Sequence, residues 1–148
     1  ALTAHSDLTV ISNNINVIQI FLNVYLRELV LVGGAVRQSD GAIVGNQAVE
    51  FICRYKADFA VIGASSLDND GSVLDFDDRE VAVARAIIRN ARVKILVADI
   101  SKFESDAPVR ICDVAELDYV ITDAPPPAAF CAAAEAANTT IIIVDNNK

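Results

Sequence analysis

Small and polar residues that could bind a ligand are concentrated directly after the apolar runs of this sequence. They lie in five short stretches, residues 12–14, 33–37, 63–66, 99–103 and 122–123. Backbone N–H groups beside glycines, an arginine fork and a lysine ammonium hold phosphate or carboxylate groups. Amide and carboxylate side chains hydrogen-bond hydroxyls. Together these groups favour recognition of an anion or a polyol.

Gly33 and Gly34 follow an apolar run, so their backbone N–H groups could approach a phosphate closely. No third glycine stands at the spacing of a dinucleotide fingerprint, and a tight turn is the preferred interpretation of the pair. Arg37 could pair with a phosphate or carboxylate, although an exposed surface arginine is the commoner case. Asn13 could contact a ligand, but capping of the next helix is the safer expectation.

Lys102 follows another apolar run, where its ammonium could bind an anion. The alternative, given equal weight, is that Asp99 or Ser101 caps a turn and that Lys102 is solvated. The placement after a strand supports the binding role, because ligands of open α/β sheets lie at the carboxyl ends of the strands.

Residues 67–80 are rich in acidic side chains. The part from Ser66 to Asp77 is close to the pattern of a calcium-binding loop. Serine replaces the first carboxylate and Asp77 replaces the terminal glutamate of that pattern. We therefore prefer a turn at residues 69–71, followed by a helix that Asp77 caps. Glu80 then either completes a capping box or hydrogen-bonds a hydroxyl at the edge of a cleft.

The elements that must position these residues are short apolar strands alternating with helices. Strands are predicted over residues 8–11, 29–32, 59–62, 95–98, 119–121 and 140–144, and helices over 14–25, 46–54, 78–92 and 126–138. Most of the apolar runs are continuous, which is typical of strands covered on both faces. The alternation predicts an α/β fold with a mostly parallel sheet.

The 148 residues suffice for one compact domain, and 53% hydrophobic with 22% charged residues excludes disorder. The net charge of −8 argues against binding of a nucleic-acid backbone by this domain itself. No apolar run is long enough for a membrane span, and no secretory signal is recognisable. The sequence has no methionine, which suggests a fragment or a processed product.

Few residue types for redox, metal or nucleophilic chemistry are present. Three cysteines, Cys53, Cys112 and Cys131, are interpreted as buried thiols in a reducing cytosol, not as a disulfide framework or a metal site. His5 is the only histidine and lies near the start of the sequence, so a Ser-His-Asp or Cys-His system has little to build on. We expect no catalytic residue, no metal and no cofactor.

Several of these segments occur in order in one known family. Residues 6–17 (SDLTVISNNINV), 31–45 (LVGGAVRQSDGAIVG), 58–88 and 96–103 (LVADISKF) resemble the effector-sensing domain of DeoR-type bacterial repressors. Each motif is weak alone, but their order over nearly the whole chain is specific. The resemblance implies a Rossmann-like sheet with helices on both faces, akin to ribose-5-phosphate isomerase and CoA transferases.

The same resemblance implies a transcriptional repressor that releases DNA when a small phosphorylated polyol or sugar binds. The first candidate for this effector is sn-glycerol 3-phosphate. It also implies a homo-oligomer, a dimer or tetramer, and a cytoplasmic location. Carried over position by position, the effector-binding residues are Asn13, Gly33, Gly34, Arg37, Gly63, Glu80 and Lys102. Lys102 and Arg37 would hold the anion, Glu80 and Asn13 the hydroxyls, and the glycines would allow close backbone approach.

The sequence also departs from the family pattern. Repressors of this family begin with a helix-turn-helix domain, and their sensing domain opens with a strand and a phosphate-binding loop before the position of Ala1. We expect residues 1–148 to be the sensor domain without these parts. Glu104 stands where the family has a small glycine, and a carboxylate beside Lys102 would weaken anion attraction.

Two other functions remain open from the sequence. A phosphosugar isomerase of the same fold would need a placed acid and base, whereas residues 62–65 (IGAS) carry no carboxylate. A ligand-free oligomerisation module is the other alternative, because apolar helix residues such as Val83 and Ile87 suit a core and an interface equally well.

Overall fold

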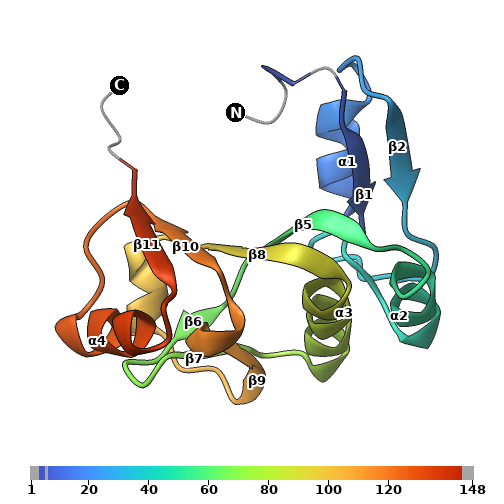
Figure 1. The fold of residues 1–148 in the computed structure, drawn as a ribbon. Helices are drawn as coiled ribbons and strands as arrows, with labels where there is room; N and C mark the ends of the chain where they lie inside the picture. The colour runs from blue at the N-terminus through green and yellow to red at the C-terminus, as the bar shows by residue number, and fades with distance from the viewer. Residues whose placement is uncertain (1–3, 6, 145–148) are drawn as a thin grey trace. The chain divides into compact units, whose positions relative to one another are not determined.

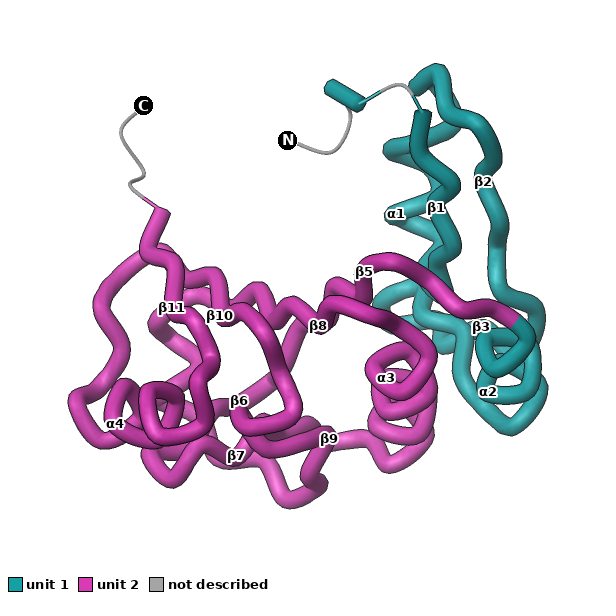
Figure 2. Tube along the Cα trace, viewed as in Figure 1, with its two compact units in different colours: residues 1–54 teal, residues 55–148 magenta. Residues whose placement is uncertain are grey.

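The chain forms two compact units, Ala1–Arg54 and Tyr55–Lys148, which Figure 2 draws in different colours. The structure is a computed structural model, and it describes residues 4–5 and 7–144. No helix in these described ranges is long and apolar enough to cross a bilayer.

Unit 1 begins with a β-α-β element. The parallel strands β1 (Thr9–Ser12) and β2 (Glu28–Leu31) are joined by α1 (Ile15–Phe21). The carboxamide of Asn14 caps this helix by accepting a hydrogen bond from the N–H of Asn16 at 2.8 Å. The expectation that Asn13 provides the cap is therefore wrong by one residue.

A short hairpin and a second helix complete unit 1. They are β3 (Ala35–Val36), the antiparallel β4 (Ile43–Val44) and α2 (Asn46–Ile52). Gly34 leads into this hairpin with a φ of +150°, and a Cβ there would stand 2.9 Å from Cγ2 of Ile43. Only glycine fits this approach without a shift of the neighbouring side chain.

Unit 2 is built on a parallel sheet of four strands in the order β11-β10-β8-β5 (Figure 1). The strands are β5 (Ala57–Ile62), β8 (Ala91–Val97), β10 (Tyr119–Thr122) and β11 (Thr140–Ile143). Ile62 pairs with Leu96 and Val97 pairs with Ile121, so the carboxyl ends of β5, β8 and β10 are in register. The loops that follow these strands must leave from one edge of the sheet.

Helices and a smaller antiparallel sheet pack against this parallel sheet. The helices are α3 (Asp78–Arg89) and α4 (Ala128–Ala136), with the 3-10 turns η2 (Ile100–Glu104) and η3 (Val114–Glu116). The antiparallel sheet has the order β6-β7-β9, with β6 (Ser66–Leu67), β7 (Ser72–Asp75) and β9 (Val109–Asp113).

The core of unit 2 lies between these layers. Leu96 and Val120 of the parallel sheet, Phe130 of α4 and Val73 of β7 are 0–1% exposed. Phe130 also meets Phe103 of η2 edge to face, with 4.9 Å between ring centroids. Truncation of a buried phenylalanine to alanine lowers the free energy of unfolding by about 3–5 kcal/mol. The contact of Phe103 with Phe130 therefore holds η2 firmly against the core.

The fold class predicted from the sequence is confirmed, because the structure is mixed α/β with a parallel four-stranded sheet flanked by helices. All six predicted strands are present within one to four residues of their expected ends. The helix predicted over 14–25 is shorter and ends at Phe21, and the short antiparallel strands β3, β4, β6, β7 and β9 were not anticipated.

The sequence predicted one turn and one helix cap of unit 2 correctly, and the structure adds a capping box that was not predicted. The turn predicted at residues 69–71 is present, with the N–H of Gly71 donating to the carbonyl of Asp68 at 3.0 Å. Asp77 caps α3 by accepting from the N–H of Arg79 at 2.9 Å. A reciprocal capping box is formed at Asp113 and Glu116, where η3 begins.

The cysteines differ in exposure. Cys112 is buried as expected and Cys131 is half-buried, whereas Cys53 is exposed after the end of α2. The expectation of three buried thiols is therefore wrong for Cys53. In the described parts of the chain, no group of three or more His, Cys, Asp or Glu side chains is placed to hold a metal ion.

The turn at Gly71 provides a test of the packing between the β6–β7 turn and η3. Gly71 has a φ of +96°, and a Cβ there would stand 2.7 Å from Cγ1 of Val114. We expect Gly71→Ala to destabilise the fold by about 1–3 kcal/mol, measured by thermal melting. In Gly63→Ala the new Cβ meets nothing closer than 4.0 Å, so this control should melt within about 0.5 kcal/mol of the parent. Equal melting temperatures of Gly71→Ala and Gly63→Ala would contradict the turn geometry.

Candidate functional site

The loops after β8 and β10 are tied together at the carboxyl edge of the parallel sheet. The N–H of Ala98 donates to the carbonyl of Ile121 at 3.0 Å, which extends the pairing of the two strands. The N–H of Ile100 donates to Oδ1 of Asp123 at 2.8 Å. Asp123 therefore fixes the start of η2 relative to β10.

Within η2, the carboxylate of Asp99 holds the turn that carries Lys102. Oδ1 of Asp99 accepts from the N–H of Ser101 at 3.0 Å and also from its hydroxyl, and the Asp99 carbonyl accepts from the N–H of Lys102 at 3.1 Å. The hydrogen bond from the Ser101 side chain is the main cause that lowers the pKa of Asp99. Of the two predicted alternatives, Asp99 and not Ser101 caps the turn, and Lys102 is half-buried and not fully solvated.

Gly63 leaves β5 at the same edge. A Cβ at this position would find only the carbonyl oxygen of Val97, at 4.0 Å, so the space beside the glycine is open. A ligand could therefore approach the backbone of Gly63 without meeting a side chain of this residue. Because β5 and β8 are neighbours in parallel register, Gly63 and the η2 segment with Lys102 belong to adjoining loops.

Thr122 lies in one of the five polar stretches of the sequence, but its burial at this edge was not anticipated. It ends β10, is 4% exposed, and its hydroxyl has no hydrogen-bond partner among the described residues. An unsatisfied buried hydroxyl costs about 1–3 kcal/mol. Its position after three apolar residues was visible in the sequence, but its burial depends on the tertiary packing.

Glu80 comes from a different element, the first turn of α3. Together with Asp78 it places negative charge near the helix N-terminus, which the helix dipole favours. The side chain is half-buried. Its predicted role toward a ligand hydroxyl stays a prediction.

Unit 1 brings Asn13 and the loop from Gly34 to Arg37 together through β4. Nδ2 of Asn13 donates to the carbonyl of Ile43 at 3.2 Å, and the N–H of Ile43 donates to the carbonyl of Asn13 at 2.6 Å. Gly34 packs on the side chain of Ile43, and the N–H of Arg37 donates to the carbonyl of Ala42 at 2.7 Å. Gly33 has no atom within 4 Å of its potential Cβ.

Arg37 is engaged in a bidentate ion pair with Asp40. Its Nε and Nη2 donate to Oδ1 and Oδ2 of Asp40 at 2.9 and 2.5 Å. This hydrogen bonding is the main cause that lowers the pKa of Asp40. The sequence analysis did not identify Asp40, although the i,i+3 spacing of opposite charges was visible.

The structure thus groups the predicted residues by unit. Gly63 and Lys102 stand on adjoining loops of unit 2, with Glu80 on α3 of the same unit. Asn13, Gly33, Gly34 and Arg37 are in unit 1, around the β3–β4 hairpin. Asp40 pairs with Arg37, Asp123 holds the start of η2, and Thr122 has a buried hydroxyl, although none of the three was among the predicted effector-binding residues.

Comparison with known proteins gives one family. A family model described as the DeoR C terminal sensor domain matches residues 1–124. The glycerol-3-phosphate regulon repressors of Escherichia coli (strain K12) and Haemophilus influenzae are 42% and 40% identical over 125 and 126 residues. These alignments cover 84% of this chain and 50% and 49% of the two repressors.

A more distant relative is the HTH-type transcriptional repressor CsqR of Escherichia coli (strain K12). It is 32% identical over 123 residues, which are 83% of this chain and 47% of the repressor. The chain therefore spans about half the length of the curated relatives that it matches.

The Arg37–Asp40 pair can be tested through the pKa of Asp40. The pKa of this carboxyl lies below its ordinary value of 3.8 because of Arg37. The pair therefore stabilises the fold above that pH, and its contribution is lost as the pH falls through the lowered pKa. We expect Arg37→Ala to move the pKa of Asp40 up toward 3.8, measured by the pH dependence of its carboxyl carbon shift.

Asp99 is the internal control for this titration, because its lowered pKa depends first on Ser101. Arg37→Ala should leave the titration of Asp99 unchanged. An Asp40 titration that is the same in the parent and in Arg37→Ala would contradict the ion pair.

Proposed function

Because this chain belongs to the family of DeoR C-terminal sensor domains, we propose that it is the effector-binding part of a bacterial transcriptional repressor. Its effector is a small phosphorylated polyol or sugar, and sn-glycerol 3-phosphate is the first candidate. The observation that carries this proposal is the 40–42% identity with two glycerol-3-phosphate regulon repressors over 84% of the chain. Binding of the effector releases the repressor from its operator.

The carboxyl edge of the parallel sheet in unit 2 supports this proposal chemically. Lys102 supplies a cation on a turn whose backbone Asp99 and Asp123 fix, so only its side chain must be ordered when an anion binds. Gly63 leaves open space beside its backbone. Glu80 supplies an acceptor for a hydroxyl.

Four residues of unit 1 carry a separate prediction from the family pattern. It assigns Arg37 to the anion, Asn13 to a hydroxyl, and Gly33 and Gly34 to close approach of the backbone. The support for these four assignments is the correspondence of their positions with the family pattern. Each of them stays a prediction.

The physical requirement for such a sensor is a difference in effector affinity between two conformations, and no chemical step is needed. The relatives named above are transcriptional repressors, which favours a protein without catalytic activity. The proposed operator contact belongs to a helix-turn-helix domain outside these residues, since a chain with a net charge of −8 attracts a polyphosphate poorly. A homo-oligomer in the cytoplasm is the assembly that fits two operator half-sites.

Thermal melting with a ligand panel tests the effector assignment. The panel contains glycerol 3-phosphate, glycerol, fructose 1-phosphate, ribose 5-phosphate and inorganic phosphate. A ligand at 100 times its dissociation constant adds about 2.7 kcal/mol, which is several degrees for a chain of this size. We expect the largest rise with glycerol 3-phosphate and none with glycerol. A largest rise with another sugar phosphate would contradict the glycerol assignment, and no rise with any of them would contradict the sensor function of this chain.

The role of Lys102 is tested by comparing two lysine variants. Lys102→Ala removes the cation at the carboxyl edge of the sheet and should weaken glycerol 3-phosphate binding by about tenfold, measured by isothermal titration calorimetry. Lys56→Ala makes the same charge change at an exposed position just before β5, at the opposite end of that strand, and should leave the affinity unchanged. Equal affinities of both variants would remove Lys102 from the site.

A further inference from the structure

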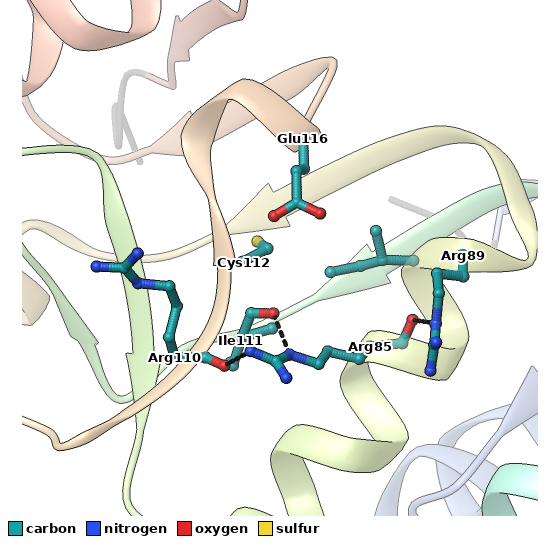
Figure 3. A pocket seen from close by; sticks show the side chains of 7 residues that line it. Arg85, Arg89, Arg110, Ile111, Cys112 and Glu116 are labelled. Atoms are coloured by element: carbon teal, nitrogen blue, oxygen red, sulfur yellow. Dashed lines mark hydrogen bonds between the residues drawn. The ribbon is translucent and has the colours of Figure 1, made fainter.

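A small cavity lies between α3 and β9 of unit 2, and none of the residues that the sequence predicted for the effector lines it. Its volume is about 170 Å³. Figure 3 shows the side chains that line it, Arg85, Ile88, Arg89, Arg110, Ile111, Cys112 and Glu116. Three of these seven residues are arginines, in a chain whose net charge is −8.

Arg85 is held in place by the backbone of β9. Its Nε donates to the carbonyl of Ile111 at 2.9 Å, and its Nη2 donates to the carbonyl of Arg110 at 2.6 Å (Figure 3). A guanidinium has five N–H donors, so three remain after these two bonds. The side chain is therefore oriented in advance and still has donors to offer.

The three arginines of the cavity differ from four other arginines of the chain, because they form no ion pair with a carboxylate of the described residues. Four other arginines form ion pairs with carboxylates, namely Arg27 with Asp7, Arg37 with Asp40, Arg79 with Asp77 and Arg92 with Asp58. For Arg85, Arg89 and Arg110, the described residues provide no carboxylate within ion-pair distance. Arg89 and Arg110 stand on either side of Arg85 in Figure 3.

The carboxylates near the cavity, Glu116, Asp113 and Asp70, accept hydrogen bonds from backbone N–H groups. Glu116 lines it, and its Oε2 accepts from the N–H of Asp113 at 2.9 Å in the capping box. Asp70 is close enough for the charge of Arg110 to lower its pKa, but the larger cause is the hydrogen bond from the N–H of Ser72. The cavity therefore keeps an excess of positive charge.

The remaining lining is apolar. Ile111 and Cys112 are 2% and 3% exposed, and burial raises the pKa of the Cys112 thiol to about 12, so it stays neutral. These buried residues form an apolar floor, and the three arginines beside it are exposed and accessible to a dissolved anion.

We propose that this cavity is an anion-binding site for a small phosphate-bearing molecule, with the phosphate oxygens bound by Arg85, Arg89 and Arg110. Guanidinium forks match the oxygen geometry of phosphate. The volume accepts a phosphate group with a short organic substituent. The site is separate from the proposed effector edge around Lys102, and it does not depend on the function proposed above.

The test is a titration of the isotope-labelled chain with inorganic phosphate, followed by amide chemical shifts at constant ionic strength. We expect saturable shifts at Arg89, Ile111 and Cys112. Arg89→Ala and Arg110→Ala should each weaken the affinity read from these amides by about tenfold. Arg85 is left intact, since it also ties α3 to β9.

Glu116→Gln adds a prediction of opposite sign. It removes a negative charge from the cavity wall and keeps a carbonyl acceptor for the N–H of Asp113, so phosphate should bind more tightly. Arg92→Ala, an arginine paired with Asp58 elsewhere on unit 2, is the matched control and should change nothing. Lys102→Ala should also leave these shifts unchanged, which separates the cavity from the effector edge.

The proposal is overturned if phosphate shifts no amide around the cavity. It is also overturned if the affinity read there is the same in Arg89→Ala, Arg110→Ala and Arg92→Ala. Loss of the cavity shifts in Lys102→Ala would assign them to effector binding at the sheet edge and would overturn it as well.

Discussion

The parallel pairing of β5, β8 and β10 is the constraint on which the proposed effector edge depends. In-register parallel strands bring their carboxyl ends to one edge, so Gly63, the η2 turn and Asp123 follow as neighbours without any long loop. The hydrogen bond from Ile100 to Asp123 then fixes η2, and the ring of Phe103 anchors it to Phe130 in the core. A binding residue on this turn is therefore positioned by the sheet and not by the loop alone.

Charge is distributed unevenly over this acidic chain. Four of the eight arginines form ion pairs with nearby carboxylates among the described residues, and the pair of Arg37 and Asp40 is one of them. Lys102 and the arginines of the α3–β9 cavity form none of these ion pairs, so their cationic groups can bind a ligand. Such a pattern suits recognition of a small anion, because a small ligand needs a few placed cations and not a broadly positive surface.

The sequence predicted the six longer strands well because their apolar, β-branched runs are strong local signals. It predicted the cap at Asp77, and it left Asp99 and Ser101 as alternatives at the turn that Asp99 caps. It erred where two neighbouring residues had equal propensity, as at Asn13 and Asn14. Three features depend on which distant segments pack together and which do not, and no local sequence pattern predicts such packing. They are the exposure of Cys53, the burial of the Thr122 hydroxyl and the arginine cavity.

Mapping of glycerol 3-phosphate on the isotope-labelled chain by amide chemical shifts tests the central claim most directly. The account predicts saturable shifts at Gly63, at Ile100 to Lys102 and at Asp123, because these amides lie on the loops that leave one edge of the sheet. Saturable shifts that spare these loops and appear elsewhere would contradict the placement of the effector. A spectrum unchanged at saturating ligand would contradict effector binding by these residues altogether.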